Sequence, residues 1–391
     1  MKINIFRSNT QIKMIFILLL FLFFPLTYAK ADINFEKTNV KSISSISDSI
    51  ETQGINIEND TAFNLYGLLG NGTANNPYLI ENFIITTTNP IGIAISQTTK
   101  YFIVRNCTID STGGIGLSLY YIGSGTGQII NNTITGTPSE AIHIDGSNDL
   151  ILKDNHIINN NAGLFAGVTS NISMIGNFIY SNNYNGLYFL DSTNIFLSNN
   201  TIFNNSAAGI NLINDQNIGL NQNLINNNTY GLTLGNTSLS IITNNIFKFN
   251  LAHALVIDDN SSNNLVYLNQ FDNNLVKPQA SDDGNQNLFY NSTSKKGNYW
   301  SDYESGGVYN ITGLANNFDL YPLTKEGLNV ASNGIGLNIE KTTVFNFQTQ
   351  TQTVSVSDDI WQMATIIETV LLIIIIGVFT ALYIKRKRLI K

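Results

Sequence analysis

Short runs of alternating apolar and polar residues recur through the middle of this chain. Residues 209–212 (Gly-Ile-Asn-Leu) and 231–234 (Gly-Leu-Thr-Leu) place apolar side chains at every second position after a glycine. This period of two is typical of a β-strand with one buried face. Two shorter apolar runs separate each such strand from the next, as in residues 194–197 (Asn-Ile-Phe-Leu) and 200–202 (Asn-Thr-Ile). The pattern therefore predicts three short strands per repeat, joined by turns.

Two columns of residues keep a common spacing of 22 to 25 positions. The first column is formed by Asn82, Cys107, Asn132, Asn155, Asn177, Asn200, Asn223, Asn245, Asn269 and Asn291. The second column holds small residues and is formed by Gly92, Gly116, Ala141, Gly163, Gly186, Gly209, Gly231 and Ala254. Because both columns keep one period, we expect equivalent residues of successive repeats to lie above one another.

These features predict an all-β fold, a right-handed parallel β-helix of about ten coils with 22–25 residues each. Leucine-rich repeats are the main alternative, but they need a more regular leucine pattern and a helical return, whereas isoleucine and Asn-Asn turns predominate here. An inward asparagine at a turn can bond the backbone of neighbouring coils. The column from Asn132 to Asn291 therefore predicts a ladder of buried amides.

The two ends of the chain predict export and membrane anchoring. Basic residues precede an apolar run at 14–26, and Ala-Lys-Ala follows at 29–31, as in a cleaved signal peptide; an uncleaved anchor is the alternative. Residues 365–384 are apolar apart from Glu368, and the basic cluster 385–388 follows, which predicts a single-pass helix with a cytoplasmic C-terminus. The predicted segments are a signal peptide (1–31), a leader (32–53), an N-terminal cap (54–81), the β-helix (82–296), an aromatic cap (297–324), a Thr/Gln/Ser-rich stalk (325–360), a transmembrane helix (361–384) and a basic tail (385–391).

Composition narrows the possible functions. Only 12% of residues are charged and the formal net charge is −7, so the chain lacks the basic face of a nucleic-acid-binding protein. Lys153 is the only Lys or Arg between Cys107 and Phe247, which argues against an anionic polysaccharide as substrate. Cys107 cannot form an intramolecular disulfide, and we interpret it as structural. Asn-x-Ser/Thr sequons recur in the repeats, and exposed turn positions such as Asn204 predict N-glycosylation of an exported protein.

Two stretches at the ends of the repeats resemble a known family. Residues 72–82 (Gly-Thr-Ala-Asn-Asn-Pro-Tyr-Leu-Ile-Glu-Asn) and 297–303 (Gly-Asn-Tyr-Trp-Ser-Asp-Tyr) are similar to motifs of the NosD-like, or CASH-type, parallel β-helix repeat proteins, especially the archaeal surface type. The resemblance covers about residues 54–323. It implies a β-helix, export, and a context of carbohydrate or copper-site maturation, and it supplies no agreed catalytic constellation.

Aromatic residues gather after the last repeat. Trp300, together with Tyr299, Phe318 and Tyr321, predicts an aromatic plug on the last coil. A platform on which sugars stack is the alternative interpretation.

One coil concentrates residues with possible catalytic chemistry. His143, Asp145, Asp154 and His156 are weak catalytic or metal-site candidates, because they fall within a single coil and its turn beside Lys153. A glycoside hydrolase needs two carboxylates about 5–10 Å apart, and solvated surface is the alternative account of these residues. Copper prefers several His, Met or Cys ligands, which the repeats do not bring together, so we predict no metal and no cofactor.

Outward positions two residues after the small-residue column predict a binding face. Phe165 and Tyr188 fall on adjacent coils, and Asn211 follows on the next. Aromatic faces beside amides suit neutral glycans, while mutual packing of these side chains across coils is the alternative. We therefore expect a membrane-anchored extracellular rod that binds carbohydrate or another cell-envelope component without turnover. The alternative is a membrane-anchored hydrolase of neutral polysaccharide that uses the region of Asp145 and Asp154.

Overall fold

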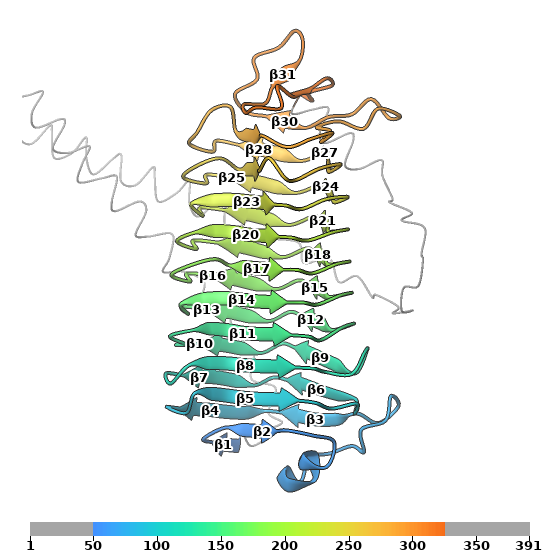
Figure 1. Cartoon of the computed structure of the whole chain (residues 1–391). Coiled ribbons are helices and arrows are strands. Elements are labelled where there is room, and N and C mark those ends of the chain that lie inside the picture. The colour runs from blue at the N-terminus through green and yellow to red at the C-terminus, as the bar shows by residue number, and fades with distance from the viewer. Residues whose placement is uncertain (1–49, 325–391) are drawn as a thin grey trace, which may run out of the picture. The chain divides into compact units, whose positions relative to one another are not determined.

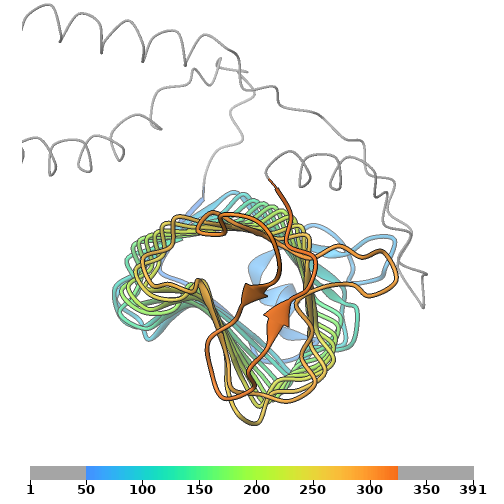
Figure 2. The same cartoon turned by 90° about the horizontal axis from the view of Figure 1, so that it is seen from above.

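The computed structural model describes residues 50–324, which form a rod of stacked coils (Figure 1). Each coil contributes short strands to three parallel sheets, which contain eleven, ten and nine strands. The coils make about nine turns and superimpose when the rod is seen along its axis (Figure 2). The predicted all-β parallel solenoid is confirmed, with a number of turns close to the ten that we expected.

The three sheets follow one another around each coil. The first sheet contains β1 (Ile50–Thr52), β4 (Phe83–Thr87), β7 (Thr108–Ser111), β10 (Thr133–Thr135), β13 (His156–Ile158), β16 (Phe178–Tyr180), β19 (Thr201–Phe203), β22 (Leu224–Asn226), β25 (Ile246–Lys248), β28 (Gln270–Asp272) and β30 (Tyr299–Trp300). The second sheet contains β2 (Ile55–Ile57), β5 (Ile91–Ser96), β8 (Ile115–Tyr120), β11 (Glu140–Asp145), β14 (Ala162–Gly167), β17 (Leu187–Leu190), β20 (Ala208–Ile213), β23 (Tyr230–Gly235), β26 (Leu255–Ile257) and β29 (Ala280–Asp282). The third sheet contains β3 (Tyr78–Glu81), β6 (Phe102–Arg105), β9 (Gly127–Ile130), β12 (Ile151–Lys153), β15 (Ser173–Ile175), β18 (Phe196–Ser198), β21 (Gly219–Asn221), β24 (Ile241–Thr243) and β27 (Leu265–Tyr267).

The core of the rod consists of like side chains stacked from coil to coil. In the first sheet Ile179 pairs with Ile202, and Ile202 pairs with Ile225, and all three are fully buried. A small residue lies at or next to the start of each strand of the second sheet, for a steric reason. A Cβ atom on Gly186 would lie only 2.7 Å from the carbonyl oxygen of Gly209 in the next coil. Direct contacts between equivalent residues of neighbouring coils therefore explain why the sequence keeps a constant repeat period.

Buried asparagines join successive coils in an inner ladder at the turn between the third and first sheets. Asn200 illustrates one rung: its Oδ1 accepts hydrogen bonds from the backbone N–H and the Nδ2 of Asn177, both at 2.9 Å. Its own Nδ2 donates to the Met174 carbonyl and to Asn223 Oδ1, both at 2.9 Å. Each rung thus satisfies backbone groups that the turn would otherwise leave buried without partners.

The residue before each rung has a left-handed backbone conformation. Asn131, Asp154 and Asn199 have φ values of 53°, 54° and 55°, and Gly176 has a φ of 68°. Asn, Asp and Gly tolerate this region better than other residues. The recurring Asn-Asn pair therefore has two separate roles, in which the first residue turns the chain and the second enters the ladder.

Two members of the predicted column, Asn82 and Asn291, are not part of the inner ladder. The last rung is formed by Asn269 and Asn298, with the backbone N–H and the Nδ2 of Asn269 at 3.1 and 3.0 Å from Asn298 Oδ1. Asn291 instead accepts from the backbone N–H of Thr293 in an exposed turn, because the last coil carries an insertion that shifts the period to 29 residues. At the other end, Ile84 pairs with Thr108, so the residue equivalent to Cys107 is not Asn82 but the residue that follows it.

The β-helix also begins earlier than predicted. Strands β1, β2 and β3 lie in the segments expected to be leader and N-terminal cap, yet they pair with β4, β5 and β6 of the next coil. The 3₁₀ helix η1 (Ala62–Tyr66) covers this end. Its Phe63 is fully buried and stacks on Tyr78 with ring centroids 4.5 Å apart.

The C-terminal end is closed by an aromatic stack around Trp300, with partners other than those predicted. The Trp300 ring stacks on Phe271 at 4.1 Å and on Tyr309 at 4.2 Å. Phe318 is 43% exposed and belongs to a short antiparallel pair of β31 (Tyr309–Asn310) and β32 (Phe318–Asp319). Phe271 is a core residue of the last coil, so the plug continues the column of buried side chains.

Several predicted segments lie outside the described residues. The signal peptide, the first part of the leader, the stalk, the transmembrane helix and the basic tail all fall before residue 50 or after residue 324. Between those limits, no helix is long and apolar enough to span a bilayer.

Candidate functional site

A column of outward side chains on the second sheet forms the candidate ligand-binding face. Backbone pairing aligns His143 with Phe165, Phe165 with Tyr188, Tyr188 with Asn211, and Asn211 with Thr233. All five side chains are half-buried, as expected for residues that stand on the outside of a sheet. Phe165, Tyr188 and Asn211, which the sequence singled out, therefore stand in register on three successive coils.

The side chains of this column contact one another. The His143 and Phe165 rings lie 5.0 Å apart with an interplanar angle of 31°, and Phe165 meets Tyr188 edge-on at 5.4 Å and 76°. Further along, the Thr233 hydroxyl donates to Asn211 Oδ1 at 2.6 Å. The Asn211 amide group and part of the rings of His143, Phe165 and Tyr188 therefore lie on one continuous surface.

The phenol of Tyr188 remains protonated at neutral pH. Burial raises its pKa, and the nearby groups of Tyr184, Asp215 and Asp191 raise it further. Tyr184 lies in the turn just before β17 and is 56% exposed. A neutral phenol can both donate and accept a hydrogen bond, which suits recognition of a hydroxylated ligand.

A contact between an imidazole and a carboxylate lies at one end of the column. The His143 imidazole is 3.8 Å from the Glu140 carboxylate, which also accepts from the Ser139 hydroxyl at 2.5 Å. Chiefly because of His143, the pKa of Glu140 falls to about 2. Glu140 therefore stays ionised at all physiological pH values and is a poor general acid.

The structure does not assemble the four catalytic candidates into one site. His143 and Asp145 lie on β11 in the second sheet, His156 lies on β13 in the first sheet, and Asp154 occupies the turn between β12 and β13. Asp154 pairs with Lys153 at 3.7 Å. Strands of different sheets face different directions, so these carboxylates and imidazoles do not converge.

No metal centre is evident within residues 50–324. No group of three His, Cys, Asp or Glu side chains in this part of the chain gathers closely enough to hold an ion. Cys107 is buried, and burial raises the pKa of its thiol to about 11, so it is protonated at neutral pH and a poor ligand for copper.

Sequence reasoning missed a second aromatic patch, on the first sheet. His156 and Phe178 lie 5.1 Å apart, and Tyr180 stacks in parallel on Phe203 at 4.6 Å. Phe178 and Tyr180 are two positions apart on β16 and so face the same side. The signal that could have found them was the outward position one and three residues after each asparagine of the inner ladder.

A second buried ladder was also missed, at the turn between the first and second sheets. Asn205 donates from its backbone N–H and its Nδ2 to Asn228 Oδ1, both at 3.0 Å. Each member follows an inner-ladder residue by five positions, a constant offset that the sequence displays. The members are Asn160, Asn182, Asn205, Asn228, Asn250 and Asn274.

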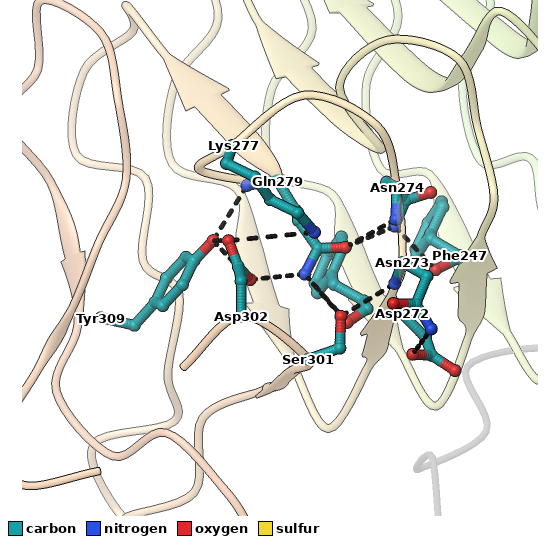
Figure 3. A network of polar contacts seen from close by, with 10 residues as sticks. Phe247, Asp272, Asn273, Asn274, Lys277, Gln279, Ser301, Asp302 and Tyr309 are labelled. Carbon is teal, nitrogen blue, oxygen red and sulfur yellow. Dashed lines mark hydrogen bonds and ion pairs between the residues drawn. The ribbon is translucent and has the colours of Figure 1, made fainter. Parts of the chain in front are cut away.

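The second ladder ends in a dense polar network in the C-terminal cap (Figure 3). Asn274 donates to the side-chain oxygen of Gln279, and Gln279 Nε2 donates to Asp302 at 2.6 Å. Tyr309 donates its hydroxyl to the same carboxylate, and Lys277 Nζ lies 4.0 Å from it. Burial lowers the pKa of Lys277, although Asp302 and Asp272 oppose that shift.

The other ladders end on carboxylates as well. The inner ladder reaches Asp319, which accepts from the Asn298 backbone at 2.6 Å and from Trp300 Nε1 at 3.0 Å. A shorter ladder of Asn264 and Asn287 reaches Asp282, at 2.9 Å from Asn287 Nδ2. A carboxylate accepts hydrogen bonds without needing an acceptor of its own, which suits it to end a chain of donors. We interpret the cap as structural on this basis.

Two protein families match parts of the chain that include coils described above. The family described as "Periplasmic copper-binding protein (NosD)" matches residues 119–305, and the family described as "Right handed beta helix region" matches residues 27–179. Together with the parallel solenoid, these matches define the class of protein. The chain is a NosD-like right-handed β-helix repeat protein. The described residues do not fit the copper named in the family description, because no ligand cluster is present among them.

Comparisons with individual proteins add little beyond the fold. No curated protein matches the chain. Among solved structures, the A-module of mannuronan C-5 epimerase AlgE6 from Azotobacter vinelandii is 18% identical with a TM-score of 0.41, and covers 53% of this chain and 65% of its own. The protein ORF18 of Geobacillus virus E2 is 12% identical with a TM-score of 0.47, and covers 66% of this chain and 64% of its own. This chain thus spans less than two thirds of those proteins, and similarity at this level carries no argument about activity.

Proposed function

We propose that this protein binds a neutral, extended glycan along the outer face of the second sheet, without chemical turnover. The single observation that carries the proposal is the column of His143, Phe165, Tyr188, Asn211 and Thr233, held in register on five successive coils. Aromatic rings offer apolar faces to sugar rings, and amide and hydroxyl groups can bond to sugar hydroxyls.

Periodicity supports a polymer rather than a single small sugar. Successive coils are about 4.8 Å apart, so the column repeats its contacts at that interval along the rod. A chain of linked sugars laid along the axis can repeat its own contacts in the same direction. A linear repeating surface therefore favours a linear repeating ligand.

The charge of this face supports a neutral ligand. No strand of the second sheet contains Lys or Arg within the described part of the chain. The face does carry the acidic residues Glu140 and Asp145, and the lowered pKa of Glu140 keeps its carboxylate ionised. An anionic polymer would meet repulsion here without a compensating cation, whereas a neutral glycan would not.

The enzymatic alternative receives less support. Hydrolysis requires two carboxylates about 5–10 Å apart on either side of one bond. Asp145 ends β11 and Asp154 follows β12, so the whole of one strand and a turn separate them. We therefore favour binding over hydrolysis by this pair.

We also propose that the β-helix lies outside the cell and is held at the membrane by residues 365–384. The apolar run and the basic cluster that follows it support this placement. A cell-envelope protein remains the alternative partner for the same face.

Titration of the full-length protein on immobilised neutral polysaccharides tests the binding proposal. We expect Tyr188→Ala and Phe165→Ala each to weaken binding by about tenfold, equivalent to roughly 1.4 kcal/mol. Phe178→Ala is the matched control, because Phe178 is an exposed aromatic residue on the first sheet. Equal losses in all three variants, or no binding to any neutral polysaccharide, would refute the proposal. Release of reducing ends during incubation would favour the hydrolase instead.

A further inference from the structure

The outer face of the third sheet carries a stripe of outward residues, most of them apolar, that runs the length of the rod. Backbone pairing aligns outward residues from Leu79 on β3 to Leu288 after β27. Between them the stripe includes Ile103, Ile151, Phe196, Ile241 and Leu265, and it is interrupted by Gln128, Ser173 and Gly219. Ile241 is 48% exposed and Leu288 is 39% exposed.

This pattern is unusual for a sheet face exposed to water. Outward positions of a solvated sheet are normally polar, and extended apolar patches mark interaction sites. The inward neighbours of the stripe, such as Ile242 and Val266, are fully buried in the core. Third-sheet strands at these positions are therefore apolar on both faces, as strands covered on both sides are.

The charge of the same face differs from that of the whole chain. The formal net charge of the protein is −7. On the described strands of the third sheet, the charged residues are Glu81, Arg105 and Lys153. Glu81 and Arg105 form an ion pair at 2.6 Å, and Lys153 pairs with Asp154 at 3.7 Å. Two copies of this face can therefore approach without the repulsion that their acidic surfaces would otherwise cause.

We propose that two copies of this chain associate side by side through the third sheet. A partner of the same length and shape matches a stripe that extends along the whole rod, and a two-fold pair places each stripe against itself. The nine steps between Leu79 and Leu288 span about 43 Å at about 4.8 Å per coil. Strands of three residues are about 10 Å long, so the projected contact is about 430 Å² per copy, at the weak end of specific interfaces. A contact of this size predicts weak association.

Disulfide cross-linking of the full-length protein in its membrane tests this arrangement. Ser173 lies at the middle of the stripe, so Ser173→Cys brings two thiols together whether the rods are parallel or antiparallel. Ser118→Cys is the matched control, because Ser118 is a half-buried, outward serine on the second sheet. Cys107 does not compete, since it is buried and its thiol is protonated.

We expect covalent dimers from Ser173→Cys under mild oxidation and fewer than one fifth as many from Ser118→Cys. A second substitution, Ile241→Asp, introduces a charge into the stripe and should lower the dimer yield at least fivefold. Ile246→Asp in the same background should not, because Ile246 is 37% exposed on the first sheet of the same coil. Similar yields from the two cysteine variants, insensitivity to Ile241→Asp, or cross-linking to a different protein would each overturn the proposal. Failure here would leave glycan binding by the second sheet unaffected.

Discussion

Removal of one rung from the inner ladder is the sharpest test of what stabilises this fold. Asn200→Ala takes away the oxygen that accepts from the backbone N–H and the Nδ2 of Asn177. Both asparagines are about 1% exposed or less, so water cannot replace the lost acceptor. Leaving a buried donor without a partner costs about 1–3 kcal/mol. The two donors of Asn177 together predict a loss of about 2–6 kcal/mol.

This loss is large compared with the total stability of a domain, which is typically about 5–15 kcal/mol. The free energy of unfolding should be measured by urea titration with far-UV circular dichroism as the signal. Hydrogen exchange of the Asn177 amide gives a local reading, which matters because solenoids need not unfold in one step. We expect that amide to exchange faster in Asn200→Ala than in the parent protein.

Two variants separate the ladder from other effects of substitution. Asn199→Gly changes the exposed neighbour but preserves its left-handed φ of 55°, so we expect little loss of stability. Asn200→Asp keeps the acceptor for Asn177 but places a carboxylate oxygen near the Met174 carbonyl and Asn223 Oδ1. Protonation restores a donor there, so this variant should become more stable as the pH falls. A loss in Asn200→Ala no larger than that in Asn199→Gly would show that the ladder contributes little.

Two further predictions concern buried carboxyl groups. Burial raises the pKa of Asp215 to about 7, so between about pH 4 and 7 the folded state holds a proton that the unfolded state releases. The free energy of unfolding should therefore fall by up to about 4 kcal/mol as the pH rises across this window. Asp215→Asn should remove this pH dependence, and a pH profile of thermal unfolding that is the same in the variant as in the parent protein would contradict the prediction. Asp319→Ala should destabilise the C-terminal cap by about 3 kcal/mol or more, because Asn298 and Trp300 lose their buried acceptor. Trp300 fluorescence reports that loss, and Asp319→Asn, which retains an acceptor, should be affected less.

The period of the sequence predicted most of the architecture because every coil makes the same contacts. Asn177, Asn200 and Asn223 fall in one column, and in the structure they bond directly to one another. Where the period changes, prediction failed. The longer last coil moved the ladder from Asn291 to Asn298, and a prediction made from the spacing alone could not allow for the insertion.

The candidate site was predictable only in part. Phe165 and Tyr188 could be placed on one face because strands alternate strictly between inside and outside. The grouping of Asp145 with Asp154 depended on proximity in sequence, and a turn between two sheets separates residues that are close along the chain. Asp215 is buried in a turn, where its carboxylate oxygens accept hydrogen bonds from the backbone N–H groups of Ser192 and Ile213.

The one-way direction of the ladders bears on how such a rod can change its length. Each asparagine takes donors from the coil before it and gives donors to the coil after it. A duplicated coil inserted in the middle would meet the same groups above and below, so it would leave no new polar atom without a partner. Only the final coil must provide acceptors such as Asp319. Growth or shortening by whole coils is therefore tolerated anywhere between two fixed ends, whereas loss of either end is not.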